Sequence, residues 1–207
     1  MTEALAMPHD HYAGRWTVDE VLALPEDGMR RELVEGRLVE SPVPAKPHQM
    51  AGKRLEKLLD DFAPLELEAA REINLRFEAD LLIPDVMVAA TEVLAGPGHF
   101  VEPADVVIVV EILSPGNSKF ERAWKPRRYA EAGIPFYVEV DLVDGPRVTF
   151  HELRGSDYVK ISYASAGGRL HVERPFEVSF DPGDLVGVRR SAGQQDAGVG
   201  DARDQHP

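Results

Sequence analysis

The stretch VVIVVEILSPGNSKFERAWK, residues 106–125, holds the strongest structural signal in the chain. Its first five residues are all β-branched, which is typical of a strand that other elements cover on both faces. Glu111 follows them directly, and Ser-Pro-Gly ends the run soon afterwards. A carboxylate in such a place costs several kcal/mol unless it is paired, bound to a cation or solvated. Glu111 therefore either emerges into solvent as the strand ends or has partners from other segments.

The segments after this strand predict a parallel pair of strands. Residues 118–133 have a helical pattern that ends at Gly133, a typical residue just beyond a helix. Residues 134–142, IPFYVEVDL, form the next expected strand, and the order strand–helix–strand indicates a right-handed crossover. Asn117 or Ser118 would cap the helix. Pro126 removes a helix hydrogen bond, so we expect a kink or a break there.

The N-terminal part predicts two helices and a hairpin. Thr17 and Glu20 have the spacing of a capping box at the start of a short helix. Two alternating runs flank Glu35-Gly36, as in a hairpin. Residues 48–63 carry apolar side chains three and four positions apart, which predicts an amphipathic helix packed against a sheet.

Short apolar runs predict the remaining strands. We expect one strand at 66–77 and another at 81–90, interrupted by Pro84, with a loop at 91–104. Towards the C-terminus, an antiparallel meander is expected from three further runs, at residues 146–155, 157–165 and 169–180.

Length and composition indicate one globular domain. The chain has 207 residues, of which 43% are hydrophobic and 29% charged, enough for a real core. We place this domain at residues 16–190, between a flexible N-terminus (1–15) and a disordered tail (191–207). No run is apolar enough for a membrane span and no secretion signal is visible, so we expect a cytoplasmic protein. Without cysteine, any metal must be held by carboxylates, histidines or carbonyls.

The charge pattern limits how nucleic acid could bind. A formal net charge of −13 argues against a non-specific binder, because binding to a phosphate backbone rests on Lys and Arg. Locally, however, residues 119–128 hold five basic residues against one acidic residue. His48 could contact phosphate, cap the predicted helix or lie in the core. The predicted nucleic-acid contacts are Lys119, Arg122, Arg127, Arg128 and His48.

Two acids and one lysine have the properties of a metal-dependent hydrolytic site. Asp85 stands in an apolar run, as Glu111 does, and the two could share a divalent ion if their strands are neighbours. Lys125 could fold back towards Glu111, although its spacing to Glu121 also fits a surface ion pair. Two carboxylates and a lysine suit phosphodiester hydrolysis, in which carboxylates hold Mg²⁺ and an ammonium group stabilises charge or orients water.

Several motifs occur in a recognisable order between Val18 and Asp141. They are RELVEGRLVESP, PHQ at a helix start, IPDVMV, VVEILSPGNS and ERAWKPRRYAEAGIPFYVEVD. This series resembles the Uma-type restriction endonuclease family of the PD-(D/E)XK nuclease superfamily. The resemblance implies an α/β (α+β) restriction-endonuclease-like core, in which helices flank a mixed central β-sheet, followed by the C-terminal antiparallel meander. It also implies an endonuclease that depends on Mg²⁺ or Mn²⁺.

By position, the resemblance assigns roles to five residues. Asp85 would be the first metal-binding acid and Glu111 the second, with the backbone carbonyl of Ile112 as a further ligand. Glu32 would be a helper acid, and it could instead pair with Arg on a hairpin edge. Leu113 occupies the usual lysine position of the superfamily, so Lys125 would be a migrated catalytic lysine.

Two readings of function follow. The first is a metal-dependent endonuclease that acts on nucleic acid, with DNA as the expected substrate. The second is a catalytically inactive nuclease-like module that binds nucleic acid or a protein partner, which the net charge and Leu113 favour. A homodimer is compatible with both readings.

Overall fold

The computed structural model describes residues 15–25, 27–41, 44–113, 119–143 and 145–187, and the side chains of 119–121 are not described. The disordered tail predicted at 191–207 lies outside these residues. So do the candidate caps Asn117 and Ser118 and, apart from Arg15, the N-terminus predicted to be flexible.

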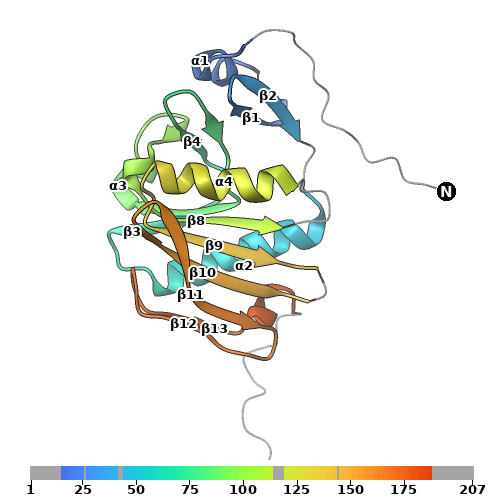
Figure 1. The fold of residues 1–207 in the computed structure, drawn as a ribbon, viewed down its shortest axis with the longest axis vertical. Coiled ribbons are helices and arrows are strands. Elements are labelled where there is room, and N and C mark those ends of the chain that lie inside the picture. Colours follow the sequence, from blue (N-terminus) through green and yellow to red (C-terminus); the bar gives the residue numbers. More distant parts are fainter. Residues whose placement is uncertain (1–14, 26, 42–43, 114–118, 144, 188–207) are drawn as a thin grey trace, which may run out of the picture.

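A six-stranded mixed sheet forms the centre of the fold (Figure 1), in the order β11-β10-β9-β8-β6-β3. As predicted, β8 runs parallel to β9, and it runs antiparallel to β6 on its other side. The fold class is therefore confirmed: a mixed sheet with flanking helices. The strands of this sheet are β3 (Leu67–Ala70), β6 (Val86–Ala90), β8 (Val106–Leu113), β9 (Phe136–Asp141), β10 (Arg147–Arg154) and β11 (Asp157–Ser165).

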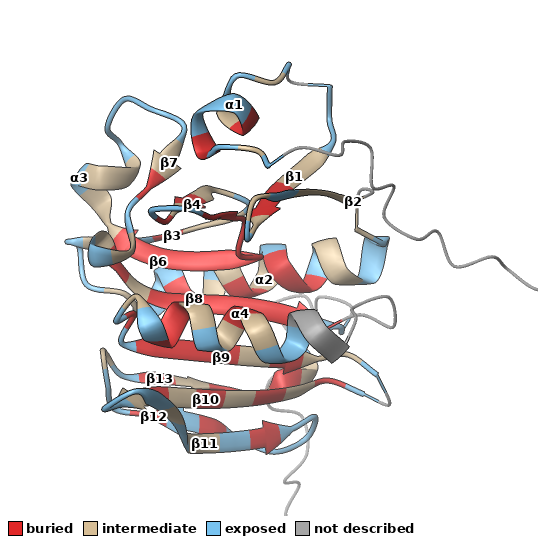
Figure 2. Cartoon of the chain, turned by 45° about the horizontal axis from the view of Figure 1, so that its top comes forward, coloured by how far each residue is buried: buried red, intermediate tan, exposed pale blue. Residues whose placement is uncertain are grey.

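Helices cover both faces of this sheet. Leu55 and Leu59 of α2 (Lys46–Phe62) pack against Ile108 and Val110 of β8. On the other face, Tyr129 of α4 (Lys119–Glu131) packs with Val109. Successive residues of a strand point to opposite faces, so Glu111 shares the α4 face with Val109. Figure 2 shows β6 and β8 buried along most of their length, as expected for strands between two helices.

A second, five-stranded sheet has the order β2-β1-β5-β4-β7. The short helix α1 (Val18–Leu22) packs on it, and the predicted Thr17–Glu20 capping box is confirmed. The hairpin is also confirmed, with Glu35 and Gly36 both at positive φ, as a two-residue hairpin turn requires. The strands are β1 (Arg30–Val34), β2 (Arg37–Ser41), β4 (Asn74–Arg76), β5 (Leu81–Leu82) and β7 (Phe100–Val101).

Several predicted elements are divided in the structure. The strand expected at 66–77 becomes β3 and β4 in different sheets, separated at Glu72, whose φ of 57° interrupts extended backbone. Residues 81–90 divide at Pro84, which has no N–H for a ladder, into β5 and β6. The loop expected at 91–104 holds α3 (Thr91–Leu94), β7 and part of a 3₁₀ turn (Pro103–Asp105).

Two predictions in the C-terminal half of the chain, for Pro126 and for residues 169–180, were also wrong in part. Pro126 does not break α4, which continues through it to Glu131. Gly133 lies two residues beyond the end of the helix with a φ of 79°, as predicted for a glycine just past a helix. Residues 169–180 do not extend the meander, because β12 (Leu170–Val172) and β13 (Val178–Phe180) pair with each other in a separate small sheet.

Candidate active site

Neighbouring strands bring the two predicted acids to the same part of the large sheet. Asp85 directly precedes β6, and its backbone N–H donates to the carbonyl of Val110 at 3.1 Å. Glu111 is the next residue of β8. The antiparallel pairing of β6 with β8 therefore satisfies the condition on which the shared site was predicted.

Glu111 is held by two residues of α4. Its Oε1 accepts a hydrogen bond from the Tyr129 hydroxyl at 2.5 Å. Lys125 Nζ lies 3.3 Å from Oε1 and 3.4 Å from Oε2. Lys125 and Tyr129 are one helical turn apart, so both project from the same face of α4. Lys125 thus reaches back to Glu111 as predicted, even though Pro126 follows it.

Glu32 joins this cluster from β1 of the five-stranded sheet. Its Oε1 accepts from Lys125 Nζ at 2.8 Å and from the backbone N–H of Ile83, also at 2.8 Å. Lys125 therefore sits between two carboxylates that come from different sheets. Glu32, Glu111 and Lys125 are each no more than 8% exposed, so the three charges are buried together.

Asp85 has a separate set of partners. Its Oδ1 accepts from Arg30 Nη1 at 2.9 Å, and Arg30 also donates to the carbonyl of Ile83. Its Oδ2 accepts from the backbone N–H of Ile112 at 2.7 Å. Sequence reasoning missed Arg30 as a member of the site. Its spacing of two residues from Glu32 was the available signal, because residues i and i+2 lie on one face of a strand.

His48 completes the cluster from the first turn of α2. Its Nε2 lies 3.2 Å from Asp85 Oδ2 and 3.0 Å from the backbone carbonyl of Ile112. The sequence predicted a phosphate contact, a cap or a core position for this residue. The structure places the imidazole against two oxygens of the predicted metal site.

Burial and neighbouring charges move the pKa values of these acids in opposite directions. Burial raises the pKa of Glu111 to about 7, and the positive charge of Lys125 opposes this only in part. Burial would also raise the pKa of Asp85, but the hydrogen bond from His48 and the charge of Arg30 hold it at about 2. For Glu32, the charges of Lys125 and Arg30 outweigh burial and lower the pKa. At neutral pH, Glu111 is thus the acid that exchanges a proton.

The raised pKa of Glu111 predicts that the stability of the fold depends on pH. In EDTA, raising the pH from 5 to 8 should lower the free energy of unfolding by roughly 3 kcal/mol through Glu111. The folded pKa of about 7 lies above the ordinary value of 4.5, so the folded state holds a proton that the unfolded chain releases. Urea unfolding across this pH range measures the effect.

Glu111→Gln provides the control for this prediction. The neutral amide should remove the contribution of Glu111, while that of His48, whose pKa is also raised, should remain. Equal pH slopes for the variant and the unchanged protein would contradict the assignment to Glu111. Asp85 does not interfere, because its pKa of about 2 confines its contribution to acidic pH.

The donor atoms near Asp85 suit a hard divalent cation. In the described part of the chain, no three His, Asp or Glu side chains are grouped so as to hold a metal ion. Two oxygens do converge, however: Asp85 Oδ2 and the Ile112 carbonyl, which share His48 Nε2 as a neighbour. Of the Glu111 oxygens, Oε2 has the longer contact with Lys125 and does not contact Tyr129, which leaves it capacity for a cation. Carboxylate and carbonyl oxygens are the ligands that Mg²⁺ and Mn²⁺ prefer.

The predicted nucleic-acid contacts differ in their surroundings. Arg127 is exposed and pairs with Glu131 on α4 at 2.9 Å. Arg128 is instead held by the protein, with Nε 2.7 Å from buried Asp80 and its guanidinium over the ring of Phe77. Arg122 is exposed, and the side chain of Lys119 lies outside the described residues.

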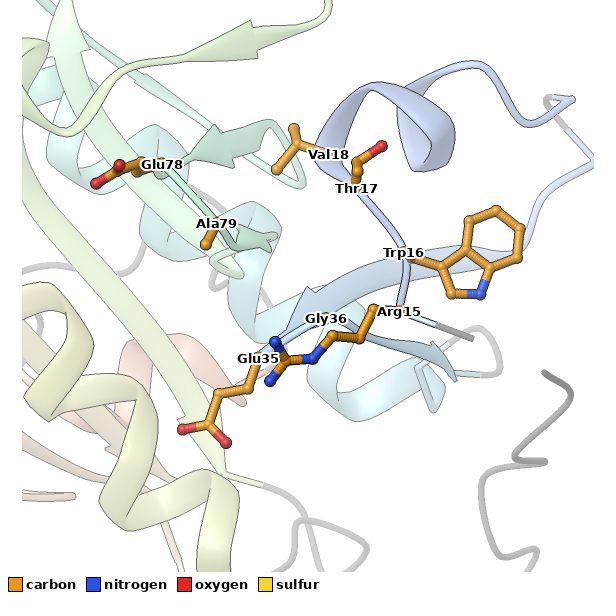
Figure 3. A pocket seen from close by; sticks show the side chains of 8 residues that line it. All are labelled: Arg15, Trp16, Thr17, Val18, Glu35, Gly36, Glu78 and Ala79. Carbon is orange, nitrogen blue, oxygen red and sulfur yellow. The ribbon is translucent and has the colours of Figure 1, made fainter. Parts of the chain in front are cut away.

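A cavity of about 470 Å³ lies elsewhere, beside the hairpin turn (Figure 3). Segment 15–18 and the Glu35-Gly36 turn form two of its walls, and residues 78–79 form a third. None of the predicted site residues lines it. The ion cluster, rather than this cavity, is therefore the candidate active site.

The comparisons with known proteins identify the family of the chain. A family model, Uma2, described as "Putative restriction endonuclease", matches residues 18–185, which include every residue of the cluster. The chain belongs to the Uma2 family. The family predicted from the motifs is thereby confirmed, and a restriction-endonuclease-like nuclease is the class of protein that this membership indicates.

A solved structure resembles the fold of this Uma2 protein. It is described as a putative nuclease belonging to DUF820 from Anabaena variabilis, and its TM-score is 0.65 at 19% sequence identity. The similarity covers 83% of this chain and 97% of that one, and at this identity it shows the fold. No curated protein matches the chain. Within the described ranges, no helix has the length and apolar character needed to cross a membrane.

Proposed function

We propose that this Uma2 protein is a divalent-metal-dependent endonuclease that hydrolyses phosphodiester bonds, with DNA as its substrate. The observation that carries the proposal is the buried Glu111–Lys125–Glu32 ion cluster, beside which Asp85 is held by its backbone bond to Val110, the residue before Glu111. The four residues come from β8, from α4, from β1 and from the start of β6. Membership of a family of nucleases supplies the reaction class.

The proposed metal ligands are Asp85, Glu111 and the carbonyl of Ile112. A bound Mg²⁺ or Mn²⁺ would lower the pKa of a water molecule and stabilise charge on the phosphate. Burial would favour neutral Lys125, but the charges of Glu111 and Glu32 raise its pKa and keep it an ammonium group. That charge can orient the attacking water or stabilise the developing charge. Glu32 holds Lys125 in place at 2.8 Å.

The position of Lys125 answers the difficulty raised by Leu113. Leu113 and Glu111 are two residues apart in β8, so they lie on the same face of the strand. A lysine at 113 would reach the carboxylate from within the strand. Here α4 covers that face and delivers an ammonium group to it from outside the strand. A missing lysine at 113 is thus compatible with catalysis.

Plasmid cleavage tests the proposal. With Mg²⁺ or Mn²⁺ the purified protein should nick or cut plasmid DNA, and EDTA should stop the reaction. Asp85→Asn and Glu111→Gln keep the side-chain shape but remove a charged metal ligand, so each should lower the rate about a thousandfold or more. Cleavage is measured from gel time courses.

Matched controls separate the site from general charge effects. Asp61 and Glu92 are acids away from the cluster, and Asp61 pairs with Lys57 on the surface of α2. Asp61→Asn and Glu92→Gln should leave the rate within about twofold. Activity that survives in both Asp85→Asn and Glu111→Gln would sink the assignment.

An inactive nuclease-like module is the second candidate. The observation that favours it is internal charge compensation, since Arg30 and His48 contact Asp85 while Lys125 contacts the two glutamates. Such a cluster needs no metal to be stable. Calorimetry with millimolar Mn²⁺ distinguishes the two candidates, because an absence of binding together with an absence of cleavage would favour the inactive module. Light scattering would test the predicted homodimer in the same samples.

A further inference from the structure

The position of His48 points to a role that the sequence did not predict. Its side chain is 12% exposed and faces two oxygens, Asp85 Oδ2 and the Ile112 carbonyl. Nε2 is thus directed into the cluster rather than towards a passing phosphate.

The two distances from Nε2 also match the separation between neighbouring ligands of one metal ion. Ligands of Mg²⁺ lie at about 2.0–2.1 Å in near-octahedral geometry, so neighbouring ligands are separated by about 3 Å. The measured separations are 3.0 Å to the carbonyl oxygen and 3.2 Å to Oδ2. These values fit two edges of one coordination octahedron. The slightly larger Mn²⁺ fits them at least as well.

The packing of α2 explains how the imidazole reaches this place. Gly52 follows His48 by four residues, on the same face of the helix. A Cβ at Gly52 would lie 3.5 Å from Cδ1 of Ile112, the residue whose carbonyl faces His48. This is an ordinary van der Waals distance, so the face of α2 that carries Gly52 packs directly against β8. His48, one turn earlier, is carried to the Ile112 backbone.

We propose that His48 binds the same metal ion through Nε2, alongside Asp85 and the Ile112 carbonyl, and that it biases the site towards Mn²⁺ over Mg²⁺. The bias follows from ligand chemistry, because imidazole suits transition-metal ions whereas Mg²⁺ takes oxygen ligands and water. The inference rests on the metal binding of the proposed function, but it does not depend on cleavage.

Pulsed electron paramagnetic resonance of bound Mn²⁺ tests this ligand directly. The protein should be full-length and free of any histidine tag. A directly bound imidazole should give ¹⁴N modulations in the echo decay, and labelling with [¹⁵N]histidine should replace them by ¹⁵N modulations. This measurement needs no substitution, so it cannot be confounded by a variant that fails to fold.

A variant then assigns the signal to one histidine. His48→Gln should abolish the nitrogen modulations and weaken Mn²⁺ binding about tenfold or more, with a smaller change for Mg²⁺. His171→Gln, a change at an exposed site in β12, should alter neither. Calorimetric titrations with each ion measure the affinities.

The outcomes separate this inference from the proposed function. Bound Mn²⁺ without nitrogen modulations, or modulations that persist in His48→Gln, would overturn the ligand while leaving the nuclease proposal intact. Nitrogen modulations in a protein that cuts no DNA would support the ligand and count against the nuclease. No Mn²⁺ binding at millimolar ion would overturn both.

Discussion

Lys125→Met should lower the free energy of unfolding by about 3–5 kcal/mol at pH 7.5 in EDTA. The methionine keeps most of the volume but removes the ammonium group that lies between Glu32 and Glu111. Two buried carboxylates then lose their nearest positive charge. Urea denaturation followed by circular dichroism measures the change.

Two controls make this prediction specific to the buried charge. Arg127→Met removes an exposed cation from the same helix and should cost less than about 1 kcal/mol. Adding Glu32→Gln to Lys125→Met should give a double variant that is more stable, by about 1–3 kcal/mol, than the sum of the two single effects. Additive effects would show that Lys125 and Glu32 do not interact as the 2.8 Å contact indicates.

Asp85→Ala should be about as damaging, at about 3–5 kcal/mol, for a different reason. It leaves the guanidinium of Arg30 buried without its carboxylate partner and removes the acceptor of the Ile112 N–H. The loss should persist at pH 5, because the pKa of Asp85 is about 2 and its carboxylate is charged throughout this range. Unfolding curves at pH 5 and 7.5 check both parts.

The cation left behind is the expected cause, and a second substitution tests it. Arg30→Met combined with Asp85→Ala should recover at least 1 kcal/mol relative to Asp85→Ala alone. Asp61→Ala, on the surface of α2, should have little effect. If the double variant is no more stable than Asp85→Ala, the loss comes from the Ile112 hydrogen bond or from packing.

The sequence was sufficient to predict the acids and the lysine, because their placement follows from local patterns. The β-branched run of β8, the helix after it and the strand at 134–142 define one crossover unit. Its helix must return over the sheet, which brings Lys125 within reach of Glu111. Glu32 came from the family resemblance rather than from such a pattern.

The features of the fold and the site that could not be predicted depend on contacts between segments far apart in the chain. Nothing local to Pro84 shows that β5 and β6 belong to different sheets, since both are short apolar runs. The partnership of Arg30 with Asp85 depends on that division and on how the sheets meet. Tyr129 is fully buried, and its hydroxyl is satisfied by the hydrogen bond to Glu111, which joins segments that no local pattern connects.

Pro126 shows a local rule outweighed by packing. A proline inside a helix removes one hydrogen bond and costs about 3 kcal/mol. Buried partners anchor α4 on both sides of it, through Lys125 in the ion cluster and Tyr129 in the core. These contacts hold the helix together across the proline, so the break that was one of the two expected outcomes does not occur.

The ion pairs that join the five-stranded sheet to the six-stranded sheet and α4 also determine at what stage of folding the site is complete. Glu32 and Lys125 are 93 residues apart in the chain, and Arg30 and Asp85 are 55 apart. A chain in which only hairpins and single helices have formed holds no assembled cluster. During synthesis, the ribosome must release α4 before Glu32 can meet its partner. The proposed nuclease would therefore be harmless to nearby nucleic acid as a nascent chain and competent only once both sheets have docked.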